Sequence, residues 1–194
     1  MTDTHMLWLD LETTGTDETT DLILEIGAIL TDMDLNVLGE YGTPISDDGT
    51  ADLAMFVLTH KDDDYVLNMH TDNGLLDAIA EGSVERRKAE QDILDLLGVH
   101  GVKKKRCILA GSGVGHFDRR FLAVGMPELN AHLAYPTFDI GVIRRAESYW
   151  APGWLRTAND DKPHRALADA HIHLSDARTY RSAFQAAVQQ KEAR

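Results

Sequence analysis

The sequence predicts an α/β fold in which a mixed β-sheet, antiparallel in its first strands and parallel afterwards, is flanked by α-helices. Three extended apolar segments come first, at residues 6–11, 24–32 and 37–45. The last two are joined by so short a turn that they predict an antiparallel hairpin. After them, segments of helical periodicity alternate with short strands, which is typical of strands covered by helices.

The later elements follow from apolar spacing and from helix start and stop residues. Helices are expected at residues 52–59, 73–81, 83–97, 117–124 and 141–150, with a further helix opened by Pro127 and a long final helix beginning near His164. Short strands are expected at 107–110 and 137–140. Ser83 is the expected N-cap of the third helix. The loop 151–163, rich in Pro, Gly and Asp, is a candidate for mobility.

The composition predicts a single domain over residues 1–194. The chain has 194 residues, of which 43% are apolar, and no Pro/Ser/Gly-rich linker divides it. It contains no signal-like segment and no apolar run that could span a bilayer, so we expect a cytoplasmic protein without membrane contact. The single cysteine, Cys107, lies in a predicted strand and is interpreted as a small core residue.

The net charge of −13 argues against a protein that grips long nucleic acid duplexes, because such proteins present a basic face. The run Lys103-Lys104-Lys105-Arg106 is most simply a solvated face. Bound divalent cations would offset part of the acidic excess locally, so a short phosphodiester substrate is still allowed.

Two carboxylates at the end of the first strand are the strongest functional signal. Asp10 and Glu12 are two residues apart, so their side chains point to the same side of the strand. Like charges held together near a core require cations. Asp118 follows a glycine-rich strand end, and Asp169 follows His164 on the final helix. Four carboxylates and one histidine are typical of sites that cut phosphodiester bonds with two divalent cations.

Several motifs occur along the chain in a recognisable order. They are Asp10-Leu11-Glu12-Thr13-Thr14-Gly15, Leu24-Glu25-Ile26, residues 31–38, Met69-His70-Thr71-Asp72-Asn73-Gly74-Leu75, Met126-Pro127-Glu128-Leu129 and the segment from His164 to Asp169. This order resembles the DEDDh family of 3′–5′ exonucleases, and within it the oligoribonuclease branch. The resemblance spans nearly the whole chain. It implies a ribonuclease H-like fold and hydrolysis of short single-stranded RNA, with DNA left open, to 5′-mononucleotides.

The resemblance also implies residue roles. Asp10, Glu12, Asp118 and Asp169 would hold two divalent cations, Mg²⁺ or Mn²⁺, which hard carboxylate oxygens suit. His164 would be the general base, because imidazole titrates near neutral pH. All five are therefore the expected catalytic residues.

The resemblance also implies substrate contacts around the terminal nucleotides, for which Thr13, Gly15, Tyr65, His70 and Tyr135 are the candidates. Either tyrosine could stack on a base or lie in the core, and His70 could donate a hydrogen bond to a phosphate or ribose. The family further implies a homodimer in which Tyr135 reaches the neighbouring site.

The chain departs from the oligoribonuclease pattern at two positions. Thr16 stands where a leucine wedge is usual, and Pro136 follows Tyr135 where an arginine usually binds the terminal phosphate. Losing a bidentate guanidinium removes a geometry-specific phosphate contact, so strict dinucleotide specificity is not expected. A broader single-strand exonuclease of the proofreading type is the alternative.

The sequence disfavours two other classes of protein. A dinucleotide-binding protein is disfavoured because the third glycine that Gly111 to Gly115 would require is His116, and because this strand is the fourth. The intact acidic set argues against a catalytically silent interaction module.

Four further polar residues are expected to lie outside the catalytic set. His171 and His173 point about 200° apart on a helix, so they cannot share one ion and are expected at the surface or an interface. Asp139 could be a fifth carboxylate of the site, but a structural or supporting role is favoured for it, and Glu25 is expected to be a structural partner near the sheet.

Overall fold

The computed structural model describes residues 5–47, 50–59, 65–155 and 163–192. Five strands form one sheet in the order β3-β2-β1-β4-β5. β1, β2 and β3 pair antiparallel, while β4 and β5 extend the sheet in parallel from β1. The strands are β1 His5–Thr13, β2 Ile23–Asp32, β3 Val37–Pro44, β4 Cys107–Gly111 and β5 Thr137–Asp139. The predicted mixed sheet is confirmed.

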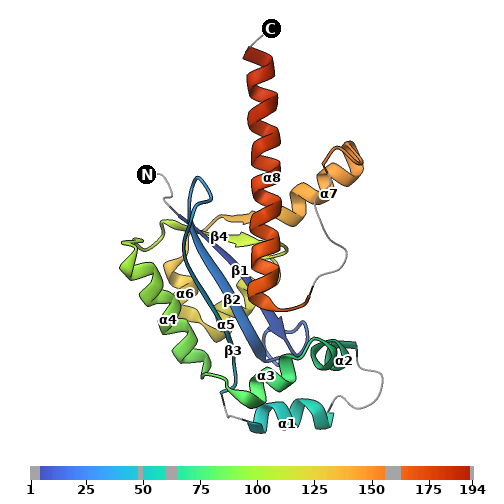
Figure 1. Cartoon of the computed structure of the whole chain (residues 1–194). Helices are drawn as coiled ribbons and strands as arrows, with labels where there is room; N and C mark the ends of the chain where they lie inside the picture. Colours follow the sequence, from blue (N-terminus) through green and yellow to red (C-terminus); the bar gives the residue numbers. More distant parts are fainter. Residues whose placement is uncertain (1–4, 48–49, 60–64, 156–162, 193–194) are drawn as a thin grey trace.

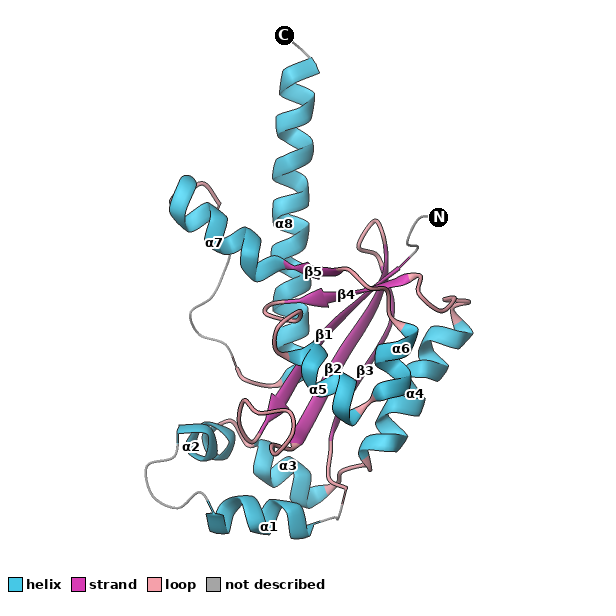
Figure 2. Ribbon diagram, turned by 180° about the vertical axis from the view of Figure 1, so that it is seen from behind, coloured by secondary structure: helices cyan, strands magenta, loops and turns pink. Residues whose placement is uncertain are grey.

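The helices form a layer on each face of the sheet. α8 crosses one face and extends well beyond it, whereas α4, α5 and α6 cover the other face (Figure 1, Figure 2). α1, α2 and α3 lie together at the end of the sheet where β1 finishes (Figure 1). The helices are α1 Thr50–Thr59, α2 Tyr65–Asp72, α3 Leu75–Glu81, α4 Arg86–Val99, α5 Asp118–Gly125, α6 Pro127–His132, α7 Ile140–Trp150 and α8 Ala166–Glu192.

The alternation of β1 decides which way its carboxylates point. Leu7, Leu9 and Leu11 belong to the apolar core beneath α4, α5 and α6. Trp8 belongs to the second core, which also contains residues of α8. Because side chains alternate along a strand, Asp10 continues the Trp8 side of β1, and Glu12 follows it. The strand therefore turns from apolar to acidic on the face that α8 covers.

The start of α8 is fixed to β2 by a close backbone approach and by one carboxylate. A β-carbon on Gly27 would lie 2.2 Å from the Leu167 nitrogen, so only glycine lets the helix come so near. Glu25 Oε1 accepts a hydrogen bond from Arg165 Nη2 at 2.7 Å, and its Oε2 accepts one from the backbone nitrogen of Ala166 at 2.8 Å. Glu25 thus satisfies a free N–H of the first turn of α8 and favours its positive dipole end. This confirms its predicted structural role.

We expect Gly27→Ala to lower the free energy of unfolding by about 1–3 kcal/mol, because the added methyl group would overlap the backbone of α8. A decrease in the urea midpoint would measure this. Gly98→Ala is the matched control, since nothing lies within 4 Å of its β-carbon position in α4. There, the same substitution is expected to stabilise by about 0.5–1 kcal/mol. Equal effects at both positions would contradict the close packing of α8 on β2.

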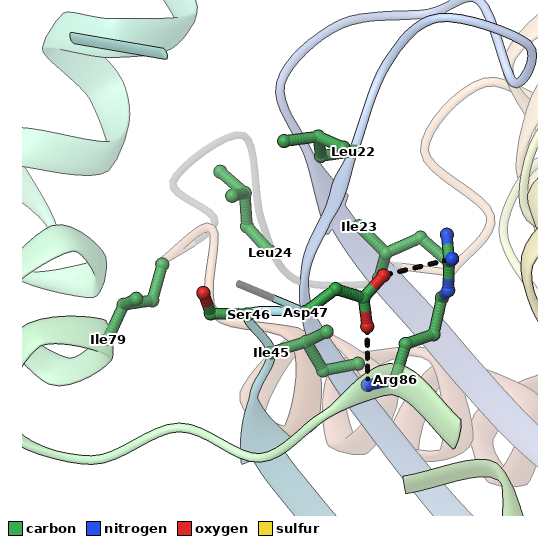
Figure 3. A pocket seen from close by; sticks show the side chains of 8 residues that line it. All are labelled: Leu22, Ile23, Leu24, Ile45, Ser46, Asp47, Ile79 and Arg86. Atoms are coloured by element: carbon green, nitrogen blue, oxygen red, sulfur yellow. Dashed lines mark hydrogen bonds and ion pairs between the residues drawn. The ribbon is translucent and has the colours of Figure 1, made fainter. Parts of the chain in front are cut away.

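The predicted N-cap at Ser83 is wrong. Residue Val84 bridges to Ile45 in extended conformation, and α4 begins three residues after Ser83, at Arg86. The backbone nitrogen of Arg86 instead donates to Asp47 Oδ1 at 2.9 Å, and its guanidinium pairs with the same carboxylate (Figure 3). The cap therefore comes from a residue 39 positions away, which local sequence spacing does not reveal. The cavity beside this pair is only about 10 Å³, room for roughly one water.

The remaining predicted helices, the single cysteine and the loop 151–163 agree with the structure in part. α2 was not predicted, whereas α3 covers most of the expected 73–81 segment. Cys107 is buried in β4, and the lysines of the 103–106 run are exposed, as expected. The loop predicted at 151–163 falls partly on residues 156–162, which lie outside the described residues. None of the described helices is long and apolar enough to cross a membrane.

Candidate active site

A pocket of about 260 Å³ opens where β1 ends, between α2, α5 and the start of α8. Its lining includes all five residues expected to be catalytic: Asp10, Glu12, Asp118, His164 and Asp169. They come from three separate parts of the chain, so the fold alone brings them together. Of the residues expected to contact substrate, Thr13, Gly15 and Tyr65 also line this pocket.

The carboxylates at this pocket are held in an enclosed setting. Glu12, Asp118 and Asp169 expose only 6%, 3% and 2% of their surface. The Asp10 side chain is 14% exposed, and its Oδ1 lies 3.9 Å from Nδ1 of His173 on α8. Burying several anions together is costly unless cations compensate them. The burial of these carboxylates therefore favours a pocket that binds cations.

Asp118 is brought to the pocket by the glycine-rich segment that follows β4. Gly111 lies against β1 so closely that a β-carbon would be 2.6 Å from the Leu9 carbonyl oxygen. At the first position of α5, Asp118 turns toward the strand, and its Oδ1 accepts a hydrogen bond from the Leu11 nitrogen at 3.0 Å. The glycine at 111 thus serves a contact with β1. This use gives no support to the dinucleotide-binding alternative.

Asp169 and His164 both come from the start of α8. Asp169 lies in the first turn of the helix, and His164 precedes it in the connecting segment with a φ of 49°. One ligand atom from each of Glu12, His164 and Asp169 lies within 4.8 Å of the other two. These three residues thus form a compact group of two carboxylates and one imidazole.

This donor set fits a divalent cation. Carboxylate oxygens are the preferred ligands of small hard cations, and imidazole is an acceptable neighbour or ligand. Glu12 and Asp169 are buried, already close together and directed into one pocket. A cation bound between them would remove the repulsion that burial otherwise imposes.

We expect Mg²⁺ or Mn²⁺ to raise the melting temperature of chelator-treated protein, because a ligand that binds only the folded state stabilises it by mass action. At about 100 times the dissociation constant, the gain would be roughly 2.7 kcal/mol. A melting curve recorded across a metal titration measures this. If the transition does not move at any metal concentration, the carboxylate group does not bind metal in the folded protein.

His70 lies beneath the pocket and does not line it. Its ring is fully buried, Nε2 donates to the Thr13 carbonyl oxygen at 3.0 Å, and Nδ1 is 4.0 Å from Glu12 Oε2. Burial lowers the pKa of His70, which favours the neutral ring. The predicted hydrogen bond to a phosphate or ribose does not fit this placement, because the ring has no open side toward the substrate. From this position the His70 ring instead holds the end of β1, which carries Glu12.

The two candidate stacking tyrosines differ in position. Tyr65, at the start of α2, is 72% exposed and lines the pocket, so its ring is available to a base. Tyr135 is 92% exposed and is not part of the pocket lining. The guanidinium of Arg119 donates to its carbonyl oxygen at 3.0 Å and fixes its backbone. Neither tyrosine is a core residue.

The prediction that His173 lies at the surface or an interface is wrong. His173 is fully buried and faces Asp10, whereas His171 is about half exposed and lies 3.2 Å from Glu40. The sequence contained a usable signal, because His173 follows Asp169 by four residues and so shares its helix face. Asp139 is structural, as predicted: its side chain accepts from the Gly141 nitrogen and caps α7.

The mixed sheet with a carboxylate-lined pocket beneath the start of α8 is that of a ribonuclease H-like nuclease. A family model described as Exonuclease (RNase_T) matches residues 7–175. The chain therefore belongs to this exonuclease family. It is 33% identical over 185 residues to the oligoribonuclease of Mycobacterium tuberculosis, covering 91% of this chain and 80% of that protein. It is 31% identical over 181 residues to the oligoribonuclease of Thiobacillus denitrificans, covering 93% and 95%.

Solved structures agree on the fold. Escherichia coli exonuclease I in complex with a 5cy-dA13 oligonucleotide superposes with a TM-score of 0.65 at 16% identity, over 92% of this chain. The present chain spans only about 40% of that protein. At this identity the likeness shows a shared fold and nothing more specific.

Proposed function

We propose that this protein is a divalent-metal-dependent 3′–5′ exonuclease that removes 5′-mononucleotides from short single-stranded oligonucleotides. The observation that carries the proposal is the meeting of Asp10, Glu12, Asp118, His164 and Asp169 in one pocket from distant parts of the chain. Membership of the exonuclease family and the oligoribonuclease relatives support the same activity.

Each residue has a distinct part in phosphodiester hydrolysis. Asp10, Glu12, Asp118 and Asp169 would hold two cations, for which Mg²⁺ and Mn²⁺ are the candidates. Bound cations supply stabilisation of charge that grows on the phosphoryl and leaving 3′ oxygens. His164 takes the proton of the attacking water as a general base. Glu25 and Gly27 fix the start of α8, so they control where Asp169 lies.

The substrate class follows from charge and pocket size. The chain carries a net charge of −13, which offers little to hold the second strand of a duplex. A pocket of about 260 Å³ accepts a small part of a nucleotide chain, and the exposed ring of Tyr65 is placed to stack on a base. RNA is the proposed substrate because the curated relatives are oligoribonucleases.

A broader single-strand exonuclease is the second candidate, and two positions favour it. Thr16 is exposed at the pocket but lacks the apolar bulk that a wedge residue requires. Pro136 has no positive charge with which to bind a terminal phosphate. Arg119 is committed to the carbonyl oxygens of Ala134 and Tyr135. One guanidinium does reach the pocket wall from α7. It belongs to Arg144, which donates to Ser112 Oγ and to Asp176.

We expect a shallow length preference. A charge-assisted phosphate contact is worth about 1.5–3 kcal/mol, so its loss would flatten a preference for dinucleotides by roughly ten- to a hundredfold. The test compares kcat/KM on a dinucleotide with that on an RNA or DNA oligomer of about five to seven nucleotides, which extends past a two-base pocket. Slow cleavage of the same oligomer in a duplex is the control.

A dinucleotide preference of roughly a thousandfold or more would contradict this reading of Thr16 and Pro136. It would imply that a positively charged side chain near the pocket binds the terminal phosphate, and Arg144 and Arg145 are the candidates. Release of internal fragments would contradict the exonuclease itself.

The proposal extends to assembly and location. A homodimer is proposed because Tyr135 is almost fully exposed outside its own pocket and its backbone is fixed by Arg119, a placement suited to reaching a partner's site. A cytoplasmic location is proposed from the single cysteine, which is buried and forms no disulfide.

A further inference from the structure

His164 has a backbone conformation that is unusual for its residue type. Its φ of 49° lies in the left-handed region, where non-glycine residues are uncommon. Such a conformation persists only when surrounding contacts hold it, and such residues cluster at functional sites. The next contact along the chain is the Glu25 pair with Arg165 and the Ala166 nitrogen, which holds the helix but not the His164 peptide itself.

The His164 peptide is held from another element. Asn73 lies in the turn between α2 and α3, and its Nδ2 donates to the His164 carbonyl oxygen at 2.6 Å. The Asn73 Oδ1 accepts from the Leu75 nitrogen at 2.9 Å. Since one partner is an acceptor and the other a donor, only this orientation of the amide satisfies both. The Asn73 backbone is itself fixed, because its nitrogen donates to the Met69 carbonyl oxygen at 3.0 Å.

We propose that Asn73 is a positioning residue for His164: its side-chain amide holds the His164 backbone in the left-handed conformation that brings the imidazole to Glu12 and Asp169. The inference rests on the proposed role of His164 as general base. A base must stay within reach of the proton it removes, and a displacement of about 1 Å can lower a rate by roughly 100-fold.

Two single variants separate the two hydrogen bonds of Asn73. Asn73→Asp keeps the oxygen that accepts from Leu75 but places a second oxygen against the His164 carbonyl. Asn73→Ala removes both contacts. If Asn73 acts on His164, both variants are expected to lower kcat by about 10- to 100-fold with KM nearly unchanged. If Asn73 served only as the cap of α3, Asn73→Asp would keep the wild-type kcat.

A matched control tests the effect of adding charge. Asn68→Asp makes the same change on exposed α2 surface, and its kcat is expected to equal that of the wild type. Melting temperatures with and without Mn²⁺ show whether each variant folds and binds metal. A variant that melts like the wild type but turns over slowly has lost positioning and kept its structure.

The deciding experiment is a double-mutant cycle with His164→Ala, measured as release of mononucleotides from a short RNA oligomer. In the His164→Ala background, Asn73→Asp is expected to change kcat by less than about twofold, because the group it positions is gone. An equal loss in both backgrounds, or a wild-type kcat for Asn73→Asp alone, would overturn the inference. An inactive wild type, or full activity of His164→Ala alone, would instead overturn the proposed function on which it rests.

Discussion

Asp10→Asn is expected to abolish turnover while leaving the protein folded. Asp10 lies at the acidic end of β1 and lines the pocket together with Glu12, Asp118 and Asp169. The amide is nearly the same shape as the carboxylate but has no charge, so it is a poor ligand for a hard divalent cation. Without metal, the variant is expected to be more stable by on the order of 1 kcal/mol, because one member of a repelling group is neutral.

The measurement combines a rate assay with melting curves recorded with and without metal. Asp95→Asn is the matched control, since it makes the same change at an exposed position on α4, which covers the opposite face of the sheet. Its rate and its metal-dependent shift should equal those of the wild type. Wild-type turnover by Asp10→Asn would remove this carboxylate from the proposed mechanism.

His164→Ala is expected to lower kcat by roughly 10² to 10⁴, which is the range for loss of a positioned general base. The effect on KM should be small, because the residue acts on the water and not on the bound oligonucleotide. Stopped assays at saturating metal and saturating substrate measure kcat directly. His171→Ala is the control, because it removes an exposed imidazole of α8 that is paired with Glu40.

His164 is close enough to Glu12 and Asp169 to share a metal ion with them. Loss of a metal ligand therefore has to be distinguished from loss of a general base. If the residue is a base, the metal concentration that half-stabilises the variant should match that of the wild type. A large weakening of metal binding, with a normal rate once metal is saturating, would assign His164 to the ligand set and not to proton transfer.

The acidic site could be predicted in part, because the order of motifs that resembles the DEDDh family joined Asp118 and Asp169 to the two carboxylates of β1. Alternation along β1 places Asp10 and Glu12 on one side of the strand. The segments that form the sheet were equally predictable from their apolar runs. Alternation along a strand and apolar runs are short-range properties of the chain, and the structure retains them.

The supporting contacts could not be predicted, because they join residues far apart in the sequence. Asp47 caps α4 from 39 residues away, and Asn73 binds the His164 carbonyl oxygen across 91 residues. His70 was misplaced for a related reason. The family resemblance suggested a substrate contact for the segment around His70, whereas the packing of α2 buries the His70 ring beneath Glu12. His173 was within reach of sequence reasoning through its spacing from Asp169.

The most direct test of the account follows degradation of 5′-labelled and 3′-labelled RNA and DNA oligomers, from two to about twenty nucleotides, by chelator-treated protein before and after Mg²⁺ or Mn²⁺ is restored. We expect no product in excess chelator. After metal is restored, we expect a ladder of 5′-labelled strands shortened one nucleotide at a time, and immediate release of labelled mononucleotide from the 3′ end. Full activity in chelator, or shortening from the 5′ end, would contradict the account.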